Sequence, residues 1–282
     1  MSTNWYPGHM KKATNNIQKL IKVIDFAIVL IDARAPFASI NRDIFGILEG
    51  KPVLIIINKI DLCDLAETKK WLDYYTRTYV RAFLIDCRLK IRDDIVKLLR
   101  QITKEKRKKA LSKGIKNPIF KGVVLGVPNV GKSTFINALI GKKQLQAQNK
   151  PGVTKNINTV RINNEFYLLD TPGILEPKYE DPTNFYKLGI IGSVKEDVLP
   201  LETVNKYIFS FLIRYYRQNL SEYYDNIRIT NDLTYSRFIA YVAKYHVSKL
   251  KNDELNIPEA EKKFFRDFKD AKIVKYTLDR IE

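Results

Sequence analysis

The chain has 282 residues, enough for one large domain or two modest ones. With 45% apolar and 28% charged residues it can bury a substantial core, which argues against a disordered chain. No apolar run approaches the roughly 18 residues that cross a membrane, and the first residues resemble neither a signal peptide nor a transit peptide. The two cysteines, Cys63 and Cys87, suit neither a disulfide framework nor a zinc site. We therefore expect a cytoplasmic protein with no membrane segment.

The net charge of +18 is unevenly distributed. Residues 1–175 contain 31 basic and 14 acidic residues, a net of +17, whereas residues 176–282 contain 18 and 17, a net of +1. Because Lys and Arg displace counterions from phosphate backbones, the excess favours a nucleic acid partner, although a Lys-rich proteome would give the same total. The basic run at residues 104–109, with Lys113 and Lys116, is either a solvated helix face or an RNA phosphate contact, and we favour the contact.

Up to residue 175, short apolar runs alternate with helical patterns. Runs rich in Ile, Val and Leu indicate buried parallel strands at residues 25–32, 53–57, 82–86 and 119–125. Helices are expected at residues 41–49, 66–78, 92–112 and 132–140, and a hairpin at residues 157–162 and 165–170. This alternation is typical of a doubly wound, mostly parallel α/β sheet.

After residue 175 the pattern becomes helical. Pro177 and Pro182 mark a linker, and from about Thr183 the apolar residues follow helical spacing. Pro258 can begin a further helix, one face of which carries Ala260, Phe264, Phe265 and Phe268. We therefore predict a sheet domain over residues 1–178 and a smaller, all-α domain over residues 179–282.

A phosphate-binding motif lies between a predicted strand and a predicted helix. Its sequence, Gly126-Val127-Pro128-Asn129-Val130-Gly131-Lys132-Ser133, fits G-x-x-x-x-G-K-[ST]. The glycines let backbone N–H groups turn toward the α- and β-phosphates, Lys132 would reach the β- and γ-phosphates, and Ser133 would bind Mg²⁺. The strand and helix on either side favour this P-loop over a plain glycine-rich turn. The predicted phosphate-contacting residues are Asn129, Val130, Gly131, Lys132, Ser133 and Thr134.

A guanine-recognition motif, Asn58-Lys59-Ile60-Asp61, follows the second predicted strand. The Asp61 carboxylate can accept two hydrogen bonds from the guanine N1–H and 2-amino group, a donor pair that adenine lacks. Asn58 would support the base edge and the neighbouring loop. The loop after the next predicted strand, where a fifth element would pack on the base, carries Asp86, Cys87 and Arg88.

A further motif, Asp170-Thr171-Pro172-Gly173, ends another strand. Asp170 would hold the Mg²⁺ shell, and the Gly173 N–H would sense the γ-phosphate. Thr154 lies between this motif and the P-loop, as a second hydroxyl ligand of Mg²⁺ or as an ordinary turn threonine.

The order of these motifs is permuted, because the guanine motif at Asn58 precedes the P-loop at Gly126. In a parallel sheet all these loops lie at the carboxyl ends of the strands, so the chain can be cut and rejoined elsewhere without moving the site. The permutation also places the switch after Gly173 directly before the helical domain. We expect residues 174–182 to transmit the nucleotide state.

This order, with Asn4-Trp5-Tyr6-Pro7-Gly8-His9-Met10 and Asp32-Ala33-Arg34-Ala35-Pro36, resembles the circularly permuted ribosome-assembly GTPases, in particular the ribosome biogenesis GTPase A family of the YlqF type. The resemblance spans nearly the whole chain. It implies a cytoplasmic GTPase that matures the large (50S) ribosomal subunit and is activated by the ribosomal particle. It also implies an RNA-contacting helical C-terminal domain. Residues 259–281 resemble the family's last helix, although Lys269-Asp270-Ala271-Lys272 stands where an Arg and Gly-Lys pattern is expected.

Hydrolysis needs a residue to position the attacking water, and Ile174 occupies the usual Gln position. The resemblance implies a catalytic role for His9, which is otherwise a capping or packing histidine. Asn129 resembles the P-loop Asn of GTPases that bind K⁺ beside the phosphates, or is merely structural. His246 is predicted to be a packing or surface residue, and Asp32 and Arg34 to order neighbouring loops or lie near the nucleotide.

The sequence thus predicts a slow GTPase that binds Mg²⁺, with K⁺ as a candidate second cation. It cycles between GTP and GDP and acts as a monomer on a large-subunit precursor of rRNA and ribosomal proteins. One alternative is a GTPase of another RNA process such as tRNA modification, which would need an added catalytic constellation. Another is a GTP-dependent RNA-binding module with little hydrolysis.

Overall fold

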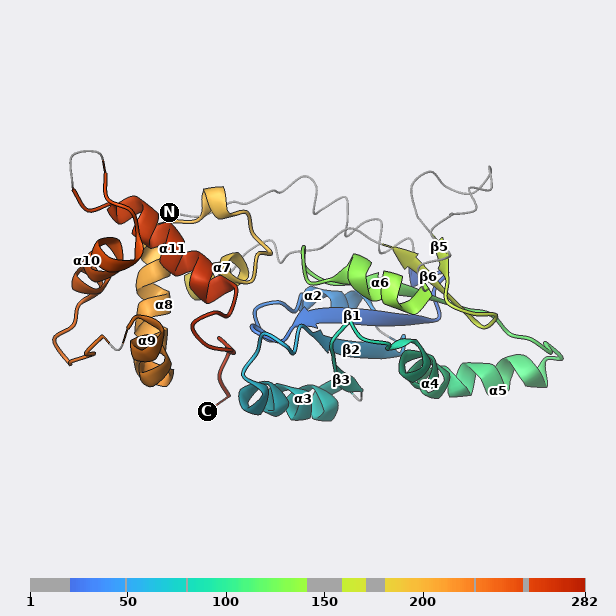
Figure 1. The fold of residues 1–282 in the computed structure, drawn as a ribbon. Coiled ribbons are helices and arrows are strands. Elements are labelled where there is room, and N and C mark those ends of the chain that lie inside the picture. Colours follow the sequence, from blue (N-terminus) through green and yellow to red (C-terminus); the bar gives the residue numbers. More distant parts are fainter. Residues whose placement is uncertain are drawn as a thin grey trace.

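The computed structural model describes residues 21–48, 50–79, 81–140, 159–170, 181–225, 227–250 and 254–281. A sheet with helices on both faces forms one side of the molecule, and a group of helices forms the other (Figure 1). Among the described helices, none is both long enough and apolar enough to cross a membrane.

The sheet has six strands in the order β3-β2-β1-β4-β6-β5. All neighbours are parallel except β5 and β6, which form the predicted antiparallel pair. The strands are β1 Phe26–Asp32, β2 Val53–Asn58, β3 Ala82–Ile85, β4 Phe120–Leu125, β5 Thr159–Arg161 and β6 Phe166–Asp170. From β1 the chain builds β2 and β3 on one flank and then crosses to β4 and β6 on the other, so the predicted doubly wound, mostly parallel sheet is confirmed.

Strand β1 is buried along its whole length because helices cover both faces of the sheet. Alternate side chains, Phe26, Ile28 and Leu30, share a core with helices α4 (Arg92–Ile102) and α6 (Lys132–Ile140). The intervening side chains, Ala27, Val29 and Ile31, share a second core with helices α2 (Asp43–Ile47) and α3 (Leu65–Tyr79). Helices α2, α3 and α6 confirm three of the four expected between the strands.

The helix expected over residues 92–112 is instead two helices, α4 and α5 (Lys104–Ser112), separated at Thr103. Thr103 is fully buried, and its hydroxyl donates to the carbonyl oxygen of Leu99 at 2.7 Å. Helix α4 buries Ile95, Val96 and Leu99, whereas α5 buries no residue. Without an apolar stripe to follow the sheet, α5 has no packing reason to continue the direction of α4.

The helical part consists of α7 Pro182–Ile190, a 3₁₀ turn Glu196–Val198, α8 Leu201–Tyr215, α9 Arg217–Tyr223, α10 Tyr235–His246 and α11 Ile257–Lys269. We call these elements the helical unit. The face predicted for the last helix is confirmed, since Ala260, Phe264, Phe265 and Phe268 are all fully buried. The Phe264 ring lies edge-on to Phe238 of α10, with ring centroids 5.0 Å apart.

The last helix ends at Lys269, not near residue 281. Ala271 adopts a left-handed conformation with φ of 56°, which terminates a helix and is more often occupied by glycine. The following residues return to the sheet, where the Leu278 N–H donates to the Arg34 carbonyl oxygen at 2.7 Å. The buried Asp279 carboxylate accepts hydrogen bonds from the N–H groups of Phe37 and Ala38. The tail therefore contacts residues on the other side of the domain boundary predicted at residue 178. The boundary itself stays a prediction.

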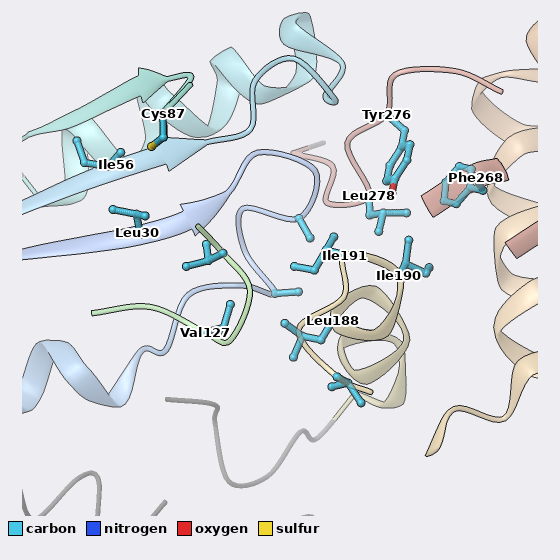
Figure 2. Close-up of a cluster of buried hydrophobic side chains, with 14 of the residues drawn as sticks. Leu30, Ile56, Cys87, Val127, Leu188, Ile190, Ile191, Phe268, Tyr276 and Leu278 are labelled. Atoms are coloured by element: carbon cyan, nitrogen blue, oxygen red, sulfur yellow. The ribbon is translucent and has the colours of Figure 1, made fainter. Parts of the chain in front are cut away.

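An apolar cluster joins the sheet to the helical unit (Figure 2). Val127, in the loop after β4, lies beside Leu188 of α7, while Tyr276 and Leu278 of the tail lie between the sheet and Phe268 of α11. The Phe268 and Tyr276 rings stack with centroids 4.1 Å apart. The site described next therefore has the helical unit packed against one side.

Candidate nucleotide site

The loops that carry the predicted site residues meet at one edge of the sheet. Asn58 ends β2, residues 86–88 follow β3, and Gly126 follows β4. Strands β2 and β4 are the parallel neighbours of β1, and β3 is the parallel neighbour of β2, so the carboxyl ends of these strands lie together although the loops are far apart in sequence.

The P-loop takes a conformation that requires glycine at two positions. At Gly126 an added Cβ would lie 2.6 Å from the Leu30 carbonyl oxygen. At Gly131, where φ is 105°, it would lie 2.4 Å from the Asn58 side-chain nitrogen. Asn129 is also left-handed, with φ of 57°. The loop is thus shaped by close backbone approach to β1 and β2.

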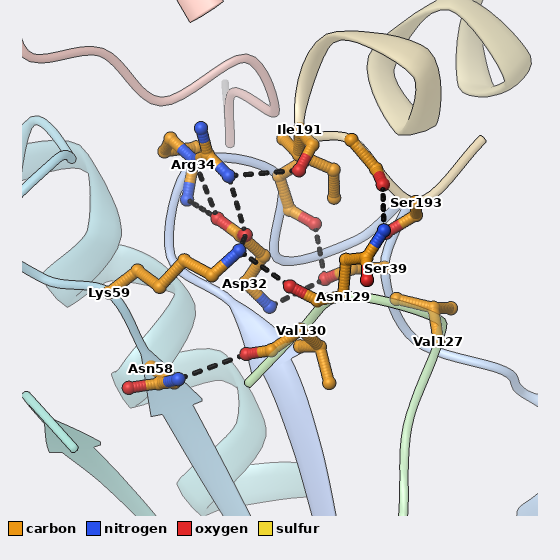
Figure 3. A network of polar contacts seen from close by, with 12 residues as sticks. Asp32, Arg34, Ser39, Asn58, Lys59, Val127, Asn129, Val130, Ile191 and Ser193 are labelled. Carbon is orange, nitrogen blue, oxygen red and sulfur yellow. Dashed lines mark hydrogen bonds and ion pairs between the residues drawn. The ribbon is translucent and has the colours of Figure 1, made fainter. Parts of the chain in front are cut away.

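Asn58 connects three loops from a buried position. Its Nδ2 donates to the Val130 carbonyl oxygen at 2.9 Å, and its Oδ1 accepts from the Cys87 N–H at 3.2 Å. The guanine motif, the P-loop and the loop after β3 are therefore held by one side chain (Figure 3 shows the bond to Val130). These bonds support the neighbouring loops, and the role of Asn58 at the base edge stays a prediction.

Lys59 makes a second link to the P-loop. Its Nζ donates to the Asn129 carbonyl oxygen at 2.7 Å and lies 2.9 Å from Oδ2 of Asp32 (Figure 3). Asp32 is fully buried and also pairs with Arg34, with 2.9 Å between Nη2 and Oδ2. Burial by itself would raise the pKa of Asp32, but Arg34 and Lys59 together hold it below its ordinary value. Asp32 therefore remains an anion and orders the neighbouring loops.

Two contacts join the P-loop to the turn that follows α7. The Asn129 side-chain Nδ2 donates to the Gly192 carbonyl oxygen at 2.7 Å, and the Ser193 hydroxyl donates to the Pro128 carbonyl oxygen at 2.8 Å. Arg34, in the loop after β1, also bonds this turn, because its Nη2 donates to the Ile191 carbonyl oxygen at 3.1 Å (Figure 3). Gly192 and Ser193 belong to no recognised motif, so sequence reasoning missed them.

The carboxylate predicted to read guanine, Asp61, pairs with Arg88, with 2.9 Å between Oδ2 and Nη2. The same guanidinium lies 2.7 Å from Oδ2 of Asp86. Hydrogen bonding by Arg88 is the main cause that lowers the pKa of Asp86. The neighbouring thiol of Cys87 is buried, which raises its pKa to about 12. The structure thus brings together the loops after β2 and β3 through an exposed arginine.

The start of α6 lies beside the end of β6. Ser133 and Thr134 in the first turn are exposed, and the Lys132 Nζ lies 3.5 Å from the carbonyl oxygens of Gly126 and Val127. The Asp170 backbone pairs in register with Val124 of β4, directly before the P-loop. Within the described residues no three His, Cys, Asp or Glu side chains gather as a metal site.

Several predicted site residues lie outside the described residues: His9, Thr154, Gly173 and Ile174, together with the side chain of Asp170. Their roles stay predictions, as does transmission through residues 174–182.

Comparisons with known proteins agree with this geometry. The family described as "50S ribosome-binding GTPase" matches residues 121–208. Ribosome biogenesis GTPase A of Priestia megaterium is 39% identical over 235 residues, which cover 83% of this chain and 82% of that protein. Its namesake from Bacillus licheniformis is 31% identical over 283 residues, covering 100% of this chain and 99% of that protein.

This chain belongs to the ribosome biogenesis GTPase A family. The crystal structure of GNP-bound YlqF from T. maritima matches this fold with a TM-score of 0.66 and 25% identity, covering 95% of this chain and 98% of that chain. The GTPase identified here is therefore a P-loop enzyme that hydrolyses GTP, with a circularly permuted domain, and it is a ribosome-biogenesis GTPase.

The buried charge at Asp32 gives a stability prediction for this GTPase. Asp32→Asn leaves the Arg34 guanidinium buried without its carboxylate, so we expect the free energy of unfolding to fall by about 3–5 kcal/mol. Urea denaturation followed by circular dichroism measures this change. Asp94→Asn is the control, because the Asp94 side chain is 77% exposed.

The same pair predicts a pH dependence. The folded-state pKa of Asp32 lies below its unfolded value of about 3.9. Its stabilisation is therefore complete above that unfolded pKa and is lost as the pH falls through the lower folded value. The difference in the free energy of unfolding between wild type and Asp32→Asn should be constant from about pH 5 to pH 8 and should decrease only below about pH 4. A gap that narrows near neutral pH would contradict the assignment.

Proposed function

We propose that this GTPase is an assembly factor for the large (50S) ribosomal subunit, with slow intrinsic turnover that the ribosomal particle stimulates. The observation that carries the proposal is the direct hydrogen bonding of the P-loop to residues 192 and 193. Through these contacts a change at the phosphates has a short route to the helical unit. The name of the matched family and those of the relatives support the large subunit as the partner.

Within this proposal each loop has one task. The backbone of Val130, Gly131 and Thr134 binds the phosphates, and Lys132 reaches the β- and γ-phosphates. Asp61 reads the guanine edge, which requires Arg88 to share or release that carboxylate. Cys87 and Asp86 hold the loop that packs on the base, and Asn58 fixes all three loops.

Magnesium fits the oxygen donors that we assign to it, the hydroxyls of Ser133 and Thr154 and the carboxylate of Asp170. Ser133 is exposed in the first turn of α6, beside the strand end that carries Asp170. Hydroxyl and carboxylate oxygens are the hard ligands that Mg²⁺ prefers. When bound, the ion neutralises charge on the phosphate oxygens.

For hydrolysis we retain two proposals, because Ile174 cannot orient water. His9 positions the attacking water, or a K⁺ bound beside Asn129 supplies positive charge at the phosphates. The Asn129 side chain donates through Nδ2 to Gly192, which leaves its oxygen to serve as the cation ligand. In that arrangement one amide holds both the cation and the turn.

The alternatives are a GTPase of another RNA process and a binding module with little hydrolysis. A tRNA-modifying enzyme would need an added catalytic group. Cys63 and Cys87 are both buried, and burial raises the pKa of both thiols, so neither suits a nucleophile. This observation favours the assembly-factor proposal.

A turnover assay tests the proposal. Purified large ribosomal subunits should raise the GTPase rate by about tenfold or more, equal to ~1.4 kcal/mol in barrier height, and should co-sediment with the GTP-bound protein. Small subunits serve as the control. Absence of both stimulation and co-sedimentation would defeat the proposal, and co-sedimentation without hydrolysis would support the binding module.

Asp61→Asn tests guanine recognition. The amide cannot accept both guanine donors, so GTP affinity should fall by about 1–3 kcal/mol. Affinity for xanthosine triphosphate should rise, because its 2-oxo group accepts a hydrogen bond from the new amide. Equilibrium binding with fluorescent nucleotides measures both, and Asp73→Asn, on the exposed side of α3, is the control. Equal loss for both nucleotides would count against the assignment.

Cation exchange tests the role of Asn129. Replacing K⁺ by Na⁺ at constant ionic strength should slow turnover several-fold in the wild type and have no effect in Asn129→Ala. An unchanged wild-type rate would leave His9 as the remaining proposal.

A further inference from the structure

The net charge of this GTPase is concentrated in the part of the sequence that precedes the helical unit. Residues 1–175 hold a net charge of +17, and residues 176–282 a net of only +1. Electrostatic attraction to a phosphate backbone depends on the local excess of Lys and Arg. The resemblance led us to expect RNA contact through the C-terminal domain, but most of the excess of Lys and Arg precedes that domain in the sequence.

Helix α5 and the loop after it are the densest part of this excess. Residues 104–116 contain seven basic residues and one acidic residue, a net of +6. The segment forms the end of the molecule opposite the helical unit (Figure 1). Helix α5 buries no residue, so neither its sequence nor its position is explained by packing of a core.

The basic side chains of this segment fall into two groups. Lys106, Arg107 and Lys108 pair with Asp25, Glu165 and Glu105, respectively. Lys104, Lys109, Lys113 and Lys116 are exposed, and their side chains have no hydrogen bond or ion pair within the described residues. Lys106 and Arg107 tie α5 to the residues that precede β1 and β6, and Lys108 pairs within α5. The second group presents four positive charges to the solvent.

Apolar side chains accompany these lysines. Leu111 and Ile115 are each 50% exposed and Ile119 is 52% exposed. A groove of about 330 Å³ lies between α5 and the start of β4, and Lys109, Lys113, Ile115, Ile119 and Phe120 are among the residues that line it. Exposed aliphatic side chains beside unpaired lysines mark a surface that contacts a partner.

We infer that α5 and the loop to residue 119 form an RNA-binding surface on the GTPase domain, separate from the helical unit. The four free lysines bind backbone phosphates, and the groove receives the ribose or an unpaired base beside them. RNA carries both features in one ligand, since unstacked bases offer apolar faces next to phosphates. The inference rests on the proposed function, because that function places the chain on ribosomal RNA.

The position of the surface has a consequence for binding. If the helical unit also contacts the RNA, the molecule has a contact at each end. Once one contact has formed, the other surface is held at a high effective concentration near the same RNA. The α5 surface supplies most of the salt-dependent part of the affinity, because residues 104–116 hold a net charge of +6 and residues 176–282 a net of only +1.

Full-length charge variants test this inference. Lys104, Lys109, Lys113 and Lys116 are changed together to Gln, which preserves helix propensity. The matched control changes Lys195, Lys244, Lys262 and Lys275 to Gln, all exposed residues of the helical unit or tail. The probe is a fluorescein-labelled RNA hairpin with an unpaired loop, titrated by anisotropy over a series of KCl concentrations.

We expect the α5 variant to bind the hairpin at least about tenfold more weakly at physiological salt. The slope of log K against log [KCl] should decrease by about 0.7–0.9 for each lost phosphate contact, so by roughly 3 in total. The control variant should keep a slope near that of the wild type. Basal GTPase activity and thermal unfolding should be unchanged in both, because none of these lysines lies in the nucleotide site.

A double variant, Ile115→Ser with Ile119→Ser, tests the groove. It should weaken hairpin binding but leave the salt slope unchanged, since no charge is removed.

Three outcomes would overturn the inference. Equal weakening by the two charge variants would mean that total charge alone matters, and stronger weakening by the control would assign the contact to the helical unit. Poly-L-glutamate serves as a second probe that stands in for an acidic protein. If the α5 variant keeps RNA binding but loses binding to poly-L-glutamate, the partner of α5 is an acidic protein. These outcomes leave co-sedimentation of the wild type with large subunits intact, whereas loss of that co-sedimentation defeats the proposed function itself.

Discussion

One buried carboxylate, that of Asp32, holds the nucleotide site together. Its desolvation is tolerable only because Arg34 and Lys59 stay beside it, and the Ser39 hydroxyl accepts the Asp32 N–H at 2.9 Å. Lys59 in turn bonds the P-loop, and Arg34 bonds the carbonyl oxygens of residues 191 and 269. The guanine motif, the phosphate loop and both ends of the helical unit therefore converge on one charge cluster. Any rearrangement that separates them must leave a buried charge without its partner.

The permuted order of the chain makes this convergence possible. The strand that leads to the P-loop lies after the guanine motif in sequence, so the helical unit follows the phosphate-sensing half of the domain. Helix α7 and its turn then lie against the P-loop, and Val127 and Leu188 share an apolar core. The tail closes the arrangement by returning to the loop after β1 and to α3, where the Trp71 indole N–H donates to the Asp279 carbonyl oxygen. The P-loop and the turn after α7 are in direct contact, so the proposed coupling of the nucleotide to the helical unit would require no long pathway.

Function is divided between two ends of the molecule. The site, the Asp32 cluster and the helical unit form a tightly packed region rich in hydrogen bonds. Helix α5 lies beyond the other end of the sheet, exposes lysines and aliphatic side chains, and contributes nothing to the core. A surface that adds little to stability but concentrates charge is explained better by a partner than by folding. Binding at both ends would fix the orientation of the GTPase on a large RNA.

The sequence by itself determined the chemistry and the sheet. Glycine spacing, the Asn58–Asp61 motif and the buried apolar runs depend on local geometry and on side-chain type, so the P-loop, the guanine motif and the parallel strands could be recognised without coordinates. Helix α6 was predicted with its observed bounds, because a glycine and a strand fix its start. The tertiary structure decided what depends on distant partners. The break at Thr103 separates a helix that buries an apolar stripe from one that buries none, and α11 ends near Ala271 where the tail turns to bond the loop after β1. The contacts of Gly192 and Ser193 with the P-loop have no local signature, because residues more than sixty positions apart meet only when the sheet and α7 are packed.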